Sequence, residues 1–255
     1  FLKRAMNYKN LYDKEIGFFH PRKMDGSFTK KYDPKFCGGQ GGRMYYAENN
    51  AYIYNFGAQH DIDGTIELMG GKEKFAEKLD NLFVEQYDGV LKSTFLMQYP
   101  DATGLMGQFC MGNEPSFHIP YLYNYCGQAY KTQRKIHELI DLWFTDSPLG
   151  ICGDEDGGAM SAFLVFSAMG FYPVNPASAE YDIGSPIFDK IEMDLPNGKT
   201  FTVCAAGASG KAKYIQSASI NGEALATPKF THAQMMEGGE LVLAMGERPN
   251  KELFA

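Results

Sequence analysis

The sequence predicts an α+β fold, with helices and long loops up to about residue 173 and a small, mostly antiparallel β-sheet region over residues 174–255. Two changes along the chain predict it. Apolar residues recur at helical spacing in the first part, and after Pro173 they alternate with polar residues, as in strands. Long, polar, glycine-rich loops separate the helical segments, which suits helical hairpins whose loops form a site at one end.

The clearest helical segment covers residues 72–87. Phe75, Leu79, Leu82 and Phe83 fall on one face, and lysine and glutamate occupy the other. The same reasoning predicts further helices over residues 61–69, 132–144 and 160–169.

The last third has the pattern of β-hairpins. Apolar and polar residues alternate over 191–195 and 201–203, and Pro196-Asn197-Gly198 between them marks a turn. A second turn is expected at Asn221-Gly222 and a further strand over 241–243. These segments predict the antiparallel sheet region.

Composition excludes several classes of protein. The formal net charge is −7 and the pI about 5.3, which argues against a nucleic-acid partner, because phosphate binding needs a basic surface. No apolar run is long enough to cross a bilayer. The five cysteines form no CxxC pair, so free cysteines are expected rather than a zinc site or disulfide framework. The first residue is Phe1, so the natural chain is expected to begin elsewhere, with any export signal outside this sequence.

One candidate site segment runs from Gly112 to His118. Pro115 suits the first position of a helix, which places Glu114 at a helix start. Glu114 is therefore either a charge that complements the helix dipole or a catalytic acid. The dipole lowers the pKa of a carboxyl group, so a general acid here would need burial or a nearby negative charge to raise it.

A second candidate segment is the acidic loop Gly153-Asp154-Glu155-Asp156-Gly157-Gly158, before the helix over 160–169. Three consecutive acids repel one another unless a helix N-terminus or a hard cation such as calcium offsets their charge. The segment is not an EF-hand, because Val165 stands at the twelfth position from Asp154. The alternative is a solvated loop that caps the helix, although the flanking glycines allow close approach of a ligand.

A third segment joins Glu48, Asn49 and Asn50 with His60 and Asp61 further on. Asp61 directly precedes a predicted helix. A His-Asp pair at a helix start is more often a helix cap than part of a functional site.

Taken together, these segments resemble glycoside hydrolase family 92, the calcium-dependent exo-acting α-mannosidases. Four segments carry the similarity in the family's order, and the run from Ile183 to Lys190 also fits. The four are Glu48 to Asp61, Ile66 to Phe75, Gly112 to Ser116, and Gly153 to Asp156 leading into Met160-Ser161-Ala162 and Gly170-Phe171-Tyr172-Pro173.

The resemblance implies a fold and a place within it. The family's catalytic module combines an N-terminal β-sandwich with an (α/α)6 toroid. The resemblance therefore implies that residues 1–173 form part of the toroid and carry the catalytic carboxylates, and that 174–255 are the C-terminal β-rich region. The sandwich and the early toroid helices would be missing partners of this chain.

The resemblance also implies roles for single residues in an inverting mechanism. Glu114 matches the general acid and Asp156 the general base, with Asp154 assisting the base. Their carboxyl groups should then stand about 6.5–9.5 Å apart to admit a water molecule. Calcium would contact mannose hydroxyls near Asn113 or Asp154. The remaining candidates line the sugar pocket and are Glu48, His60, Asp61 and His118.

The sequence departs from the family pattern in places that concern substrate preference. Met111 stands where histidine is common, Tyr52 and Phe163 where tryptophan is common, and Ala159 where glutamine is common. The leading hypothesis is an inverting exo-α-mannosidase that acts on terminal, most commonly α-1,2-linked mannose in glycans, in the periplasm or outside the cell. The alternatives are the same fold acting on another α-linked sugar, and a carbohydrate-binding or structural module without catalysis. The truncated chain by itself could lack activity.

Overall fold

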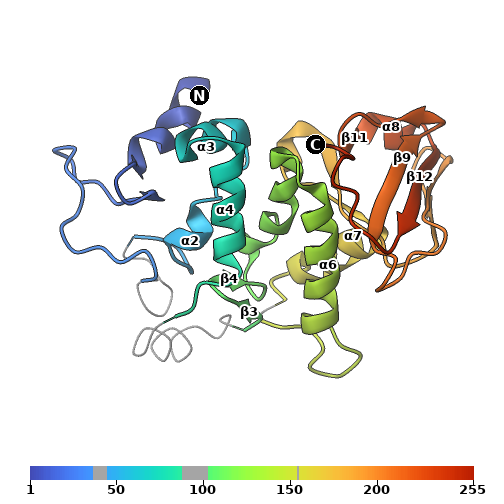
Figure 1. Cartoon of the computed structure of the whole chain (residues 1–255), viewed down its shortest axis with the longest axis horizontal. Helices are drawn as coiled ribbons and strands as arrows, with labels where there is room; N and C mark the ends of the chain where they lie inside the picture. Colours follow the sequence, from blue (N-terminus) through green and yellow to red (C-terminus); the bar gives the residue numbers. More distant parts are fainter. Residues whose placement is uncertain (37–44, 88–102, 154) are drawn as a thin grey trace. The chain divides into compact units, whose positions relative to one another are not determined.

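The computed structural model describes residues 1–36, 45–87, 103–153 and 155–255 (Figure 1). The chain forms two compact units, which are described separately. The N-terminal unit contains Phe1–Phe117 and Cys152–Asp154, and the C-terminal unit contains His118–Ile151 and Glu155–Ala255. The toroid boundary expected near residue 173 stays a prediction.

Within residues 1–36, 45–87 and 103–117, the N-terminal unit contains short helices, three of them α-helices with a buried face, and two small hairpins. Its elements in chain order are α1 (Leu2–Ala5), η1 (Met6–Leu11), β1 (Tyr12–Asp13), β2 (Phe18–Phe19), α2 (Ala51–Tyr54), α3 (Ile62–Met69), α4 (Lys72–Leu82), β3 (Leu105–Met106), β4 (Phe109–Cys110) and η2 (Glu114–Ser116).

Helices α3 and α4 follow the predicted pattern closely. Asp61 caps α3 by accepting a hydrogen bond from the Gly64 N–H, and Gly70 ends it in the left-handed conformation, as glycine does at many helix ends. Helix α4 buries Phe75 and Leu79. It ends at Leu82 rather than at the predicted residue 87, because the Leu82 carbonyl accepts from the Gln108 N–H, which belongs to the turn of the β3–β4 hairpin.

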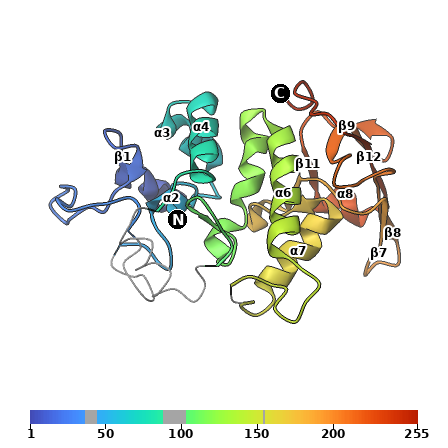
Figure 2. The same cartoon turned by 60° about the horizontal axis from the view of Figure 1, so that its bottom comes forward.

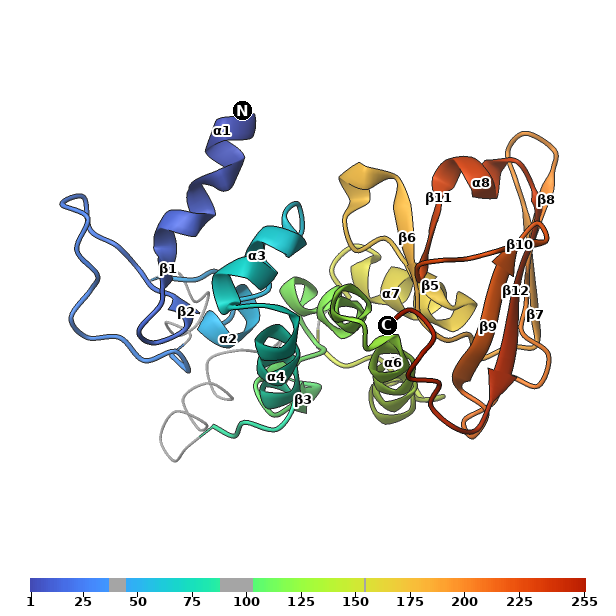
Figure 3. The same ribbon diagram turned by 45° about the horizontal axis from the view of Figure 1, so that its top comes forward.

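The C-terminal unit contains two longer helices and two sheets, which Figure 3 shows with β9 beside β12. Its elements are η3 (Ile119–Cys126), α6 (Ala129–Trp143), α7 (Ala159–Met169), β5 (Phe171–Tyr172), η4 (Pro176–Ser178), β6 (Glu180–Ile183), β7 (Lys190–Asp194), β8 (Thr200–Cys204), β9 (Tyr214–Ile220), β10 (Glu223–Ala224), β11 (Lys229–Thr231), α8 (His232–Met236) and β12 (Gly239–Gly246).

The larger sheet has the strand order β10-β9-β12-β8-β7. Figure 2 labels four of these strands, β9, β12, β8 and β7. The predicted hairpin is the antiparallel β7–β8 pair, and the predicted turn at Asn221-Gly222 joins β9 to β10. The pairing of β12 with β8 is parallel, which the alternation of residues could not reveal. The smaller sheet has the order β11-β6-β5 and is antiparallel.

A single apolar core holds the two sheets of this unit together. Its members come from both sheets and include Phe171, Phe201, Phe230 and Leu241, all of them at least 98% buried. Helix α6 is attached to the larger sheet by a polar contact, since the Gln133 carboxamide oxygen accepts from the Ile215 N–H at 3.0 Å. The mixed helical and antiparallel-sheet fold confirms the predicted α+β class.

The structure also bears on two predictions made from composition. Across residues 1–36, 45–87, 103–153 and 155–255, no helix is both long and apolar enough to pass through a lipid bilayer. Among the cysteines in these residues, Cys110, Cys126, Cys152 and Cys204 are all free, and the first two are buried.

Candidate active site

The turn before α2 is fixed by an asparagine. Asn50 caps α2 by accepting from the Tyr52 N–H at 3.1 Å, and its amide group donates to the Tyr87 hydroxyl and to Gln108, each at 2.9 Å. Asn50 is fully buried, so these bonds hold the turn against the body of the unit. Glu48, two residues earlier, is thereby held close to the start of the helix.

Glu48 adopts a strained backbone conformation. Its φ of 59° lies in the left-handed region, which residues with a side chain seldom occupy and which is enriched at functional sites. Because α2 packs against η2, this turn lies next to the Gly112–Glu114 segment.

Asn113 joins Glu48 to Glu114. The Asn113 side-chain nitrogen lies 3.5 Å from an oxygen of each carboxylate, at the long limit of hydrogen bonding. Asn113 is 2% exposed. The structure thus brings together three of the predicted site residues, two carboxylates and an amide, from segments more than 60 residues apart in the sequence.

Glu114 is the first residue of η2, as Pro115 predicted. This helix is one turn of 3-10 helix, so its dipole is weaker than that of a full α-helix. The side chain is half-buried.

The start of the acidic loop packs directly on the Gly112–Glu114 segment. A Cβ atom at Gly153 would lie 2.2 Å from the Gly112 carbonyl oxygen, so only glycine allows this approach. The Gly153 φ of 67° is left-handed as well, and its N–H donates to the Thr103 hydroxyl. Both glycines belong to the N-terminal unit. The two candidate motifs therefore meet through their glycines.

The following residues of the acidic loop precede α7 in the C-terminal unit. Glu155 accepts from the Gly158 N–H at 2.5 Å and from the Ser161 N–H at 3.2 Å, and bonds from Ser161 and Gly158 lower its pKa. Glu155 therefore caps α7. For this one of the three acids, the structure agrees with the alternative that the acidic loop caps the following helix. Asp154 lies outside the described residues.

Asp156 differs from Glu155 in having no task in the helix. It is exposed, its φ of 49° is left-handed, and no hydrogen bond or ion pair ties its carboxylate to any of the described residues. Its carboxylate is therefore available for chemistry, although its predicted distance from Glu114 stays a prediction because the two residues belong to different compact units.

The remaining candidates lie elsewhere in the two units. Asp61, in addition to capping α3, accepts from the Tyr8 hydroxyl at 2.7 Å and pairs with Lys9 at 3.0 Å. Burial alone would raise the pKa of Asp61, but these bonds together lower it. The His60 ring nitrogen Nε2 lies 2.9 Å from the Ala5 carbonyl. His118 is buried in the C-terminal unit at the start of η3.

A concave aromatic pocket of about 350 Å³ lies in the N-terminal unit and was not predicted from the sequence. We call it the aromatic pocket, and its ring-bearing lining consists of Tyr8, Phe19, Tyr45, Tyr46, Tyr54 and His60. The Tyr45-Tyr46 pair, just before Glu48, was the signal in the sequence. The aromatic content of the sequence could not show whether these tyrosines line a pocket or pack in the core.

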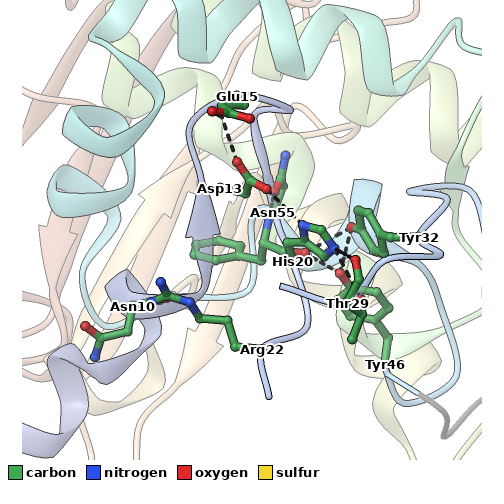
Figure 4. Close-up of polar contacts among 10 residues, drawn as sticks. Asn10, Asp13, Glu15, His20, Arg22, Thr29, Tyr32, Tyr46 and Asn55 are labelled. Carbon is green, nitrogen blue, oxygen red and sulfur yellow. Dashed lines mark hydrogen bonds and ion pairs between the residues drawn. The ribbon is translucent and has the colours of Figure 1, made fainter. Parts of the chain in front are cut away.

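Polar contacts of residues 20–32 hold Tyr46, one of the rings that line the aromatic pocket (Figure 4). His20 lies 2.9 Å from the Asp13 carboxylate and 3.0 Å from the Thr29 carbonyl, and it stacks on the Tyr32 ring. The hydrogen bond to His20 lowers the pKa of Asp13. The Tyr32 and Tyr46 hydroxyls, 2.8 Å apart, both bond to the Phe19 carbonyl.

The residues around Asn113 offer oxygen donors to a hard cation. The Asn113 side-chain oxygen is buried and accepts no hydrogen bond from the described residues, and the carboxylates of Glu48 and Glu114 adjoin the same side chain. Oxygen donors of this kind suit calcium. No group of three or more histidine, cysteine, aspartate or glutamate side chains that could hold a metal occurs in the part of the chain that the structure describes.

Two carboxylates at a shared amide, the first glycine of an acidic loop against the Gly112 backbone and an aromatic-lined pocket are the features of a glycoside hydrolase site. The comparisons with known proteins agree. Residues 1–247 match the glycosyl hydrolase family 92 catalytic domain. A secreted glycosidase of uncharacterised activity from Arthroderma benhamiae is 30% identical over 97% of this chain and 32% of its own length.

Solved structures give the same result. A family GH92 α-mannosidase from Bacteroides thetaiotaomicron, in complex with mannoimidazole, superposes with a TM-score of 0.89 at 31% identity, covering 99% of this chain and 33% of its own. An inverting family GH92 mannosidase from the same organism has a TM-score of 0.82 at 37% identity, covering 99% and 34%.

The chain belongs to glycosyl hydrolase family 92. It spans about a third of the length of the relatives that it matches.

Proposed function

We propose that this chain forms part of an inverting exo-α-mannosidase that releases terminal mannose from glycans, most commonly from α-1,2 linkages. The observation that carries the proposal is the position of the Gly112–Glu114 segment, which contacts Glu48 on one side and Gly153 of the acidic loop on the other. The names of the two Bacteroides enzymes, both mannosidases, support mannose as the sugar.

The general acid comes from the carboxylates around Asn113. Glu114 is our first assignment, because it matches the motif of the family. Glu48 is the second candidate, and its strained backbone and its place beside the same amide favour it. A proton donor at this position would protonate the leaving oxygen as the glycosidic bond breaks.

Asp156 is the proposed general base, with Asp154 assisting it. Asp156 is three residues beyond Gly153, so the covalent chain places its Cα no more than about 11 Å from that of Gly153. The exposed carboxylate is free to take a proton from water. In an inverting enzyme this water attacks the anomeric carbon from the face opposite the leaving group, which requires a carboxyl separation of about 6.5–9.5 Å.

Calcium is proposed as the cofactor, with Asn113 as a ligand through its side-chain oxygen and Asp154 as a further candidate. When bound, it would supply a positive charge that orients sugar hydroxyls. The protein's own residues then provide the proton donor and the base.

The first test is turnover. The chain is incubated with 4-nitrophenyl α-mannoside and with α-1,2-mannobiose, with and without a calcium chelator, and the configuration of released mannose is followed by NMR. Chelator-sensitive release of β-mannose supports the proposal. Binding of mannosides without turnover would support a carbohydrate-binding module instead, and faster release of another α-linked sugar would reassign the substrate.

The second test separates the two candidate acids. Glu114→Gln and Glu48→Gln are compared with Glu223→Gln, an exposed glutamate on β10, as the control. Loss of the true acid should lower turnover of mannobiose by roughly 10²–10⁴-fold. The loss should be much smaller for 4-nitrophenyl mannoside, because a good leaving group needs little protonation. If Glu114→Gln lowers turnover of both substrates equally, the acid assignment passes to Glu48.

The third test concerns the base. Asp156→Asn should lower turnover of both substrates by a similar factor, roughly 10²–10⁴-fold, because activation of water does not depend on the leaving group. Asp194→Asn on β7 is the matched control. Normal turnover in Asp156→Asn would remove Asp156 from the mechanism.

We also propose that the protein works outside the cytoplasm, in the periplasm or as a secreted enzyme. The support is the name of the Arthroderma benhamiae relative, a secreted glycosidase. Fractionation of the natural source, with detection by an antibody to this chain, tests it.

A further inference from the structure

The aromatic pocket has the size and chemistry of a ligand site. Its volume of about 350 Å³ falls within the range of roughly 300–1,000 Å³ for pockets that hold small molecules. Aromatic rings dominate its lining, and all the lining residues belong to the N-terminal unit.

The pocket offers ring carbon rather than hydroxyl groups. The Tyr8 hydroxyl donates to Asp61 at 2.7 Å, the Tyr54 hydroxyl donates to the Ala47 carbonyl at 2.7 Å, and the Tyr46 hydroxyl bonds to the Phe19 carbonyl. Three of its tyrosines are thus fixed by bonds to the protein. Their rings form a preorganised surface, which lowers the entropic cost of binding a flat group.

Tyr45 is the lining residue that remains accessible. Its side chain is 40% exposed, and no hydrogen bond from the described residues holds its hydroxyl. The neighbouring Tyr46 and Tyr54 rings are stacked, with centroids 5.5 Å apart and planes inclined by 26°. The lining of the pocket therefore combines one exposed ring with a fixed pair.

One of the two candidate acids directly follows a lining residue of the aromatic pocket. Ala47 lines the pocket and Glu48 is the next residue. Burial raises the pKa of Tyr54, and the negative charge of Glu48 raises it further.

We propose that the aromatic pocket is a leaving-group subsite, which holds the sugar ring on the far side of the scissile bond by stacking its C–H face on Tyr45 and its neighbours. This inference rests on the proposed function. It assigns the apolar rings to the leaving group of the substrate, next in the chain to Glu48, one of the two candidate acids that would protonate it. The C–H face of a pyranose is the part of a sugar that aromatic rings recognise.

The test compares a substrate that has a second ring with one that lacks it. The values of kcat/KM are measured for α-1,2-mannobiose and for α-mannosyl fluoride, whose leaving group is a single atom. Tyr45→Ala should lower the ratio of mannobiose to fluoride by roughly five- to tenfold, the order expected for loss of one aromatic contact. Tyr45→Phe, which keeps the ring, should leave the ratio near that of the natural chain.

Phe188→Ala is the control for loss of an exposed aromatic side chain, because Phe188 is 53% exposed and belongs to the C-terminal unit. Saturation-transfer NMR of mannobiose on the same variants gives a second readout. The natural chain should saturate the reducing-end ring, and Tyr45→Ala should lose that signal.

The two failures can be told apart. Hydrolysis of both substrates with an unchanged ratio and unchanged saturation transfer in Tyr45→Ala would overturn the subsite. Hydrolysis of neither substrate by the natural chain would contradict the proposed function. If the natural chain hydrolyses neither substrate, the NMR readout still tests the subsite. Equal saturation of both mannobiose rings in the natural chain and in Tyr45→Ala would overturn it.

Discussion

Asp182 is a buried carboxylate, and its hydrogen bonds and the nearby Lys229 do not fully offset the effect of burial on its pKa. It is 2% exposed, and it accepts from the Asn124 amide at 3.4 Å and the Tyr125 hydroxyl at 3.0 Å. Burial raises its pKa from 3.8 to about 6, although Lys229 and these hydrogen bonds act in the opposite direction. The folded state therefore holds the Asp182 proton more tightly than the unfolded chain does.

The pKa of Asp182 predicts the sign of a pH effect on stability. The contribution of this proton to the free energy of unfolding is fully present below about pH 4 and is lost as the pH rises through about 6. A shift of about two units corresponds to about 3 kcal/mol. Urea unfolding of the natural chain and of Asp182→Asn between pH 4 and 7 measures it. The variant should show the flatter pH dependence; an identical slope would contradict the prediction.

A serine and a histidine in the C-terminal unit could be mistaken for a nucleophilic pair. His137 Nε2 lies 2.9 Å from the Ser185 hydroxyl, which itself donates to the Lys213 carbonyl at 2.7 Å. Since Ser185 donates its only hydrogen there, it accepts from His137, and Nε2 must carry a proton. Burial and nearby Lys213 lower the pKa of His137. The pair is structural, which agrees with carboxylate-based chemistry.

Gly153 supplies a prediction at the scale of the acidic loop. Gly153→Ala would place a Cβ against the Gly112 carbonyl, whereas Gly157→Ala would meet no atom within 4 Å. The two glycines have φ values of 67° and 66°, so both variants carry the same left-handed strain of about 1–2 kcal/mol. Gly153→Ala should therefore lower the melting temperature more than Gly157→Ala. Equal melting temperatures would show that the two segments do not pack as described.

The elements with a strong apolar period were predictable from the sequence, and the short elements were not. Helices α3, α6 and α7 are found within three residues of their predicted bounds, because each buries one face. The early end of α4 and the parallel β12–β8 pair depend on contacts with distant segments, which no local pattern contains.

The same division applies to the candidate site. The Pro115 pattern placed Glu114 at a helix start, and the glycines flanking the acidic loop indicated a close approach. The meeting of Glu48 with Asn113 is a tertiary contact across 65 residues, and only the family resemblance put both near one pocket. The aromatic pocket exists because particular tyrosine rings line the same cavity. Amino-acid composition does not show which rings these are.

At the scale of the molecule, the first 24 residues expose much apolar surface. Six large apolar side chains there are more than 40% exposed, namely Phe1, Leu2, Met6, Leu11, Ile16 and Met24. Such exposure favours association, and the net charge of −7 opposes it.

Self-association of the chain should therefore increase with salt, because salt screens the repulsion between like-charged copies. Sedimentation velocity at about 20 mM and at about 500 mM sodium chloride, between which the Debye length shortens about fivefold, measures it. Leu2→Lys with Met6→Lys should reduce the association, and Val165→Lys on α7 is the control. A monomer under every condition would contradict the prediction.

The place of β12 in its sheet has a consequence for synthesis of the protein. The strand lies between β9 and β8, yet it is the last strand to be made. While the ribosome is still adding earlier residues, β9 and β8 lack their common neighbour, and their unpaired edges invite wrong partners. Completion of the sheet must then wait until Gly246 has emerged, so chaperones that shield nascent chains should matter most during that interval.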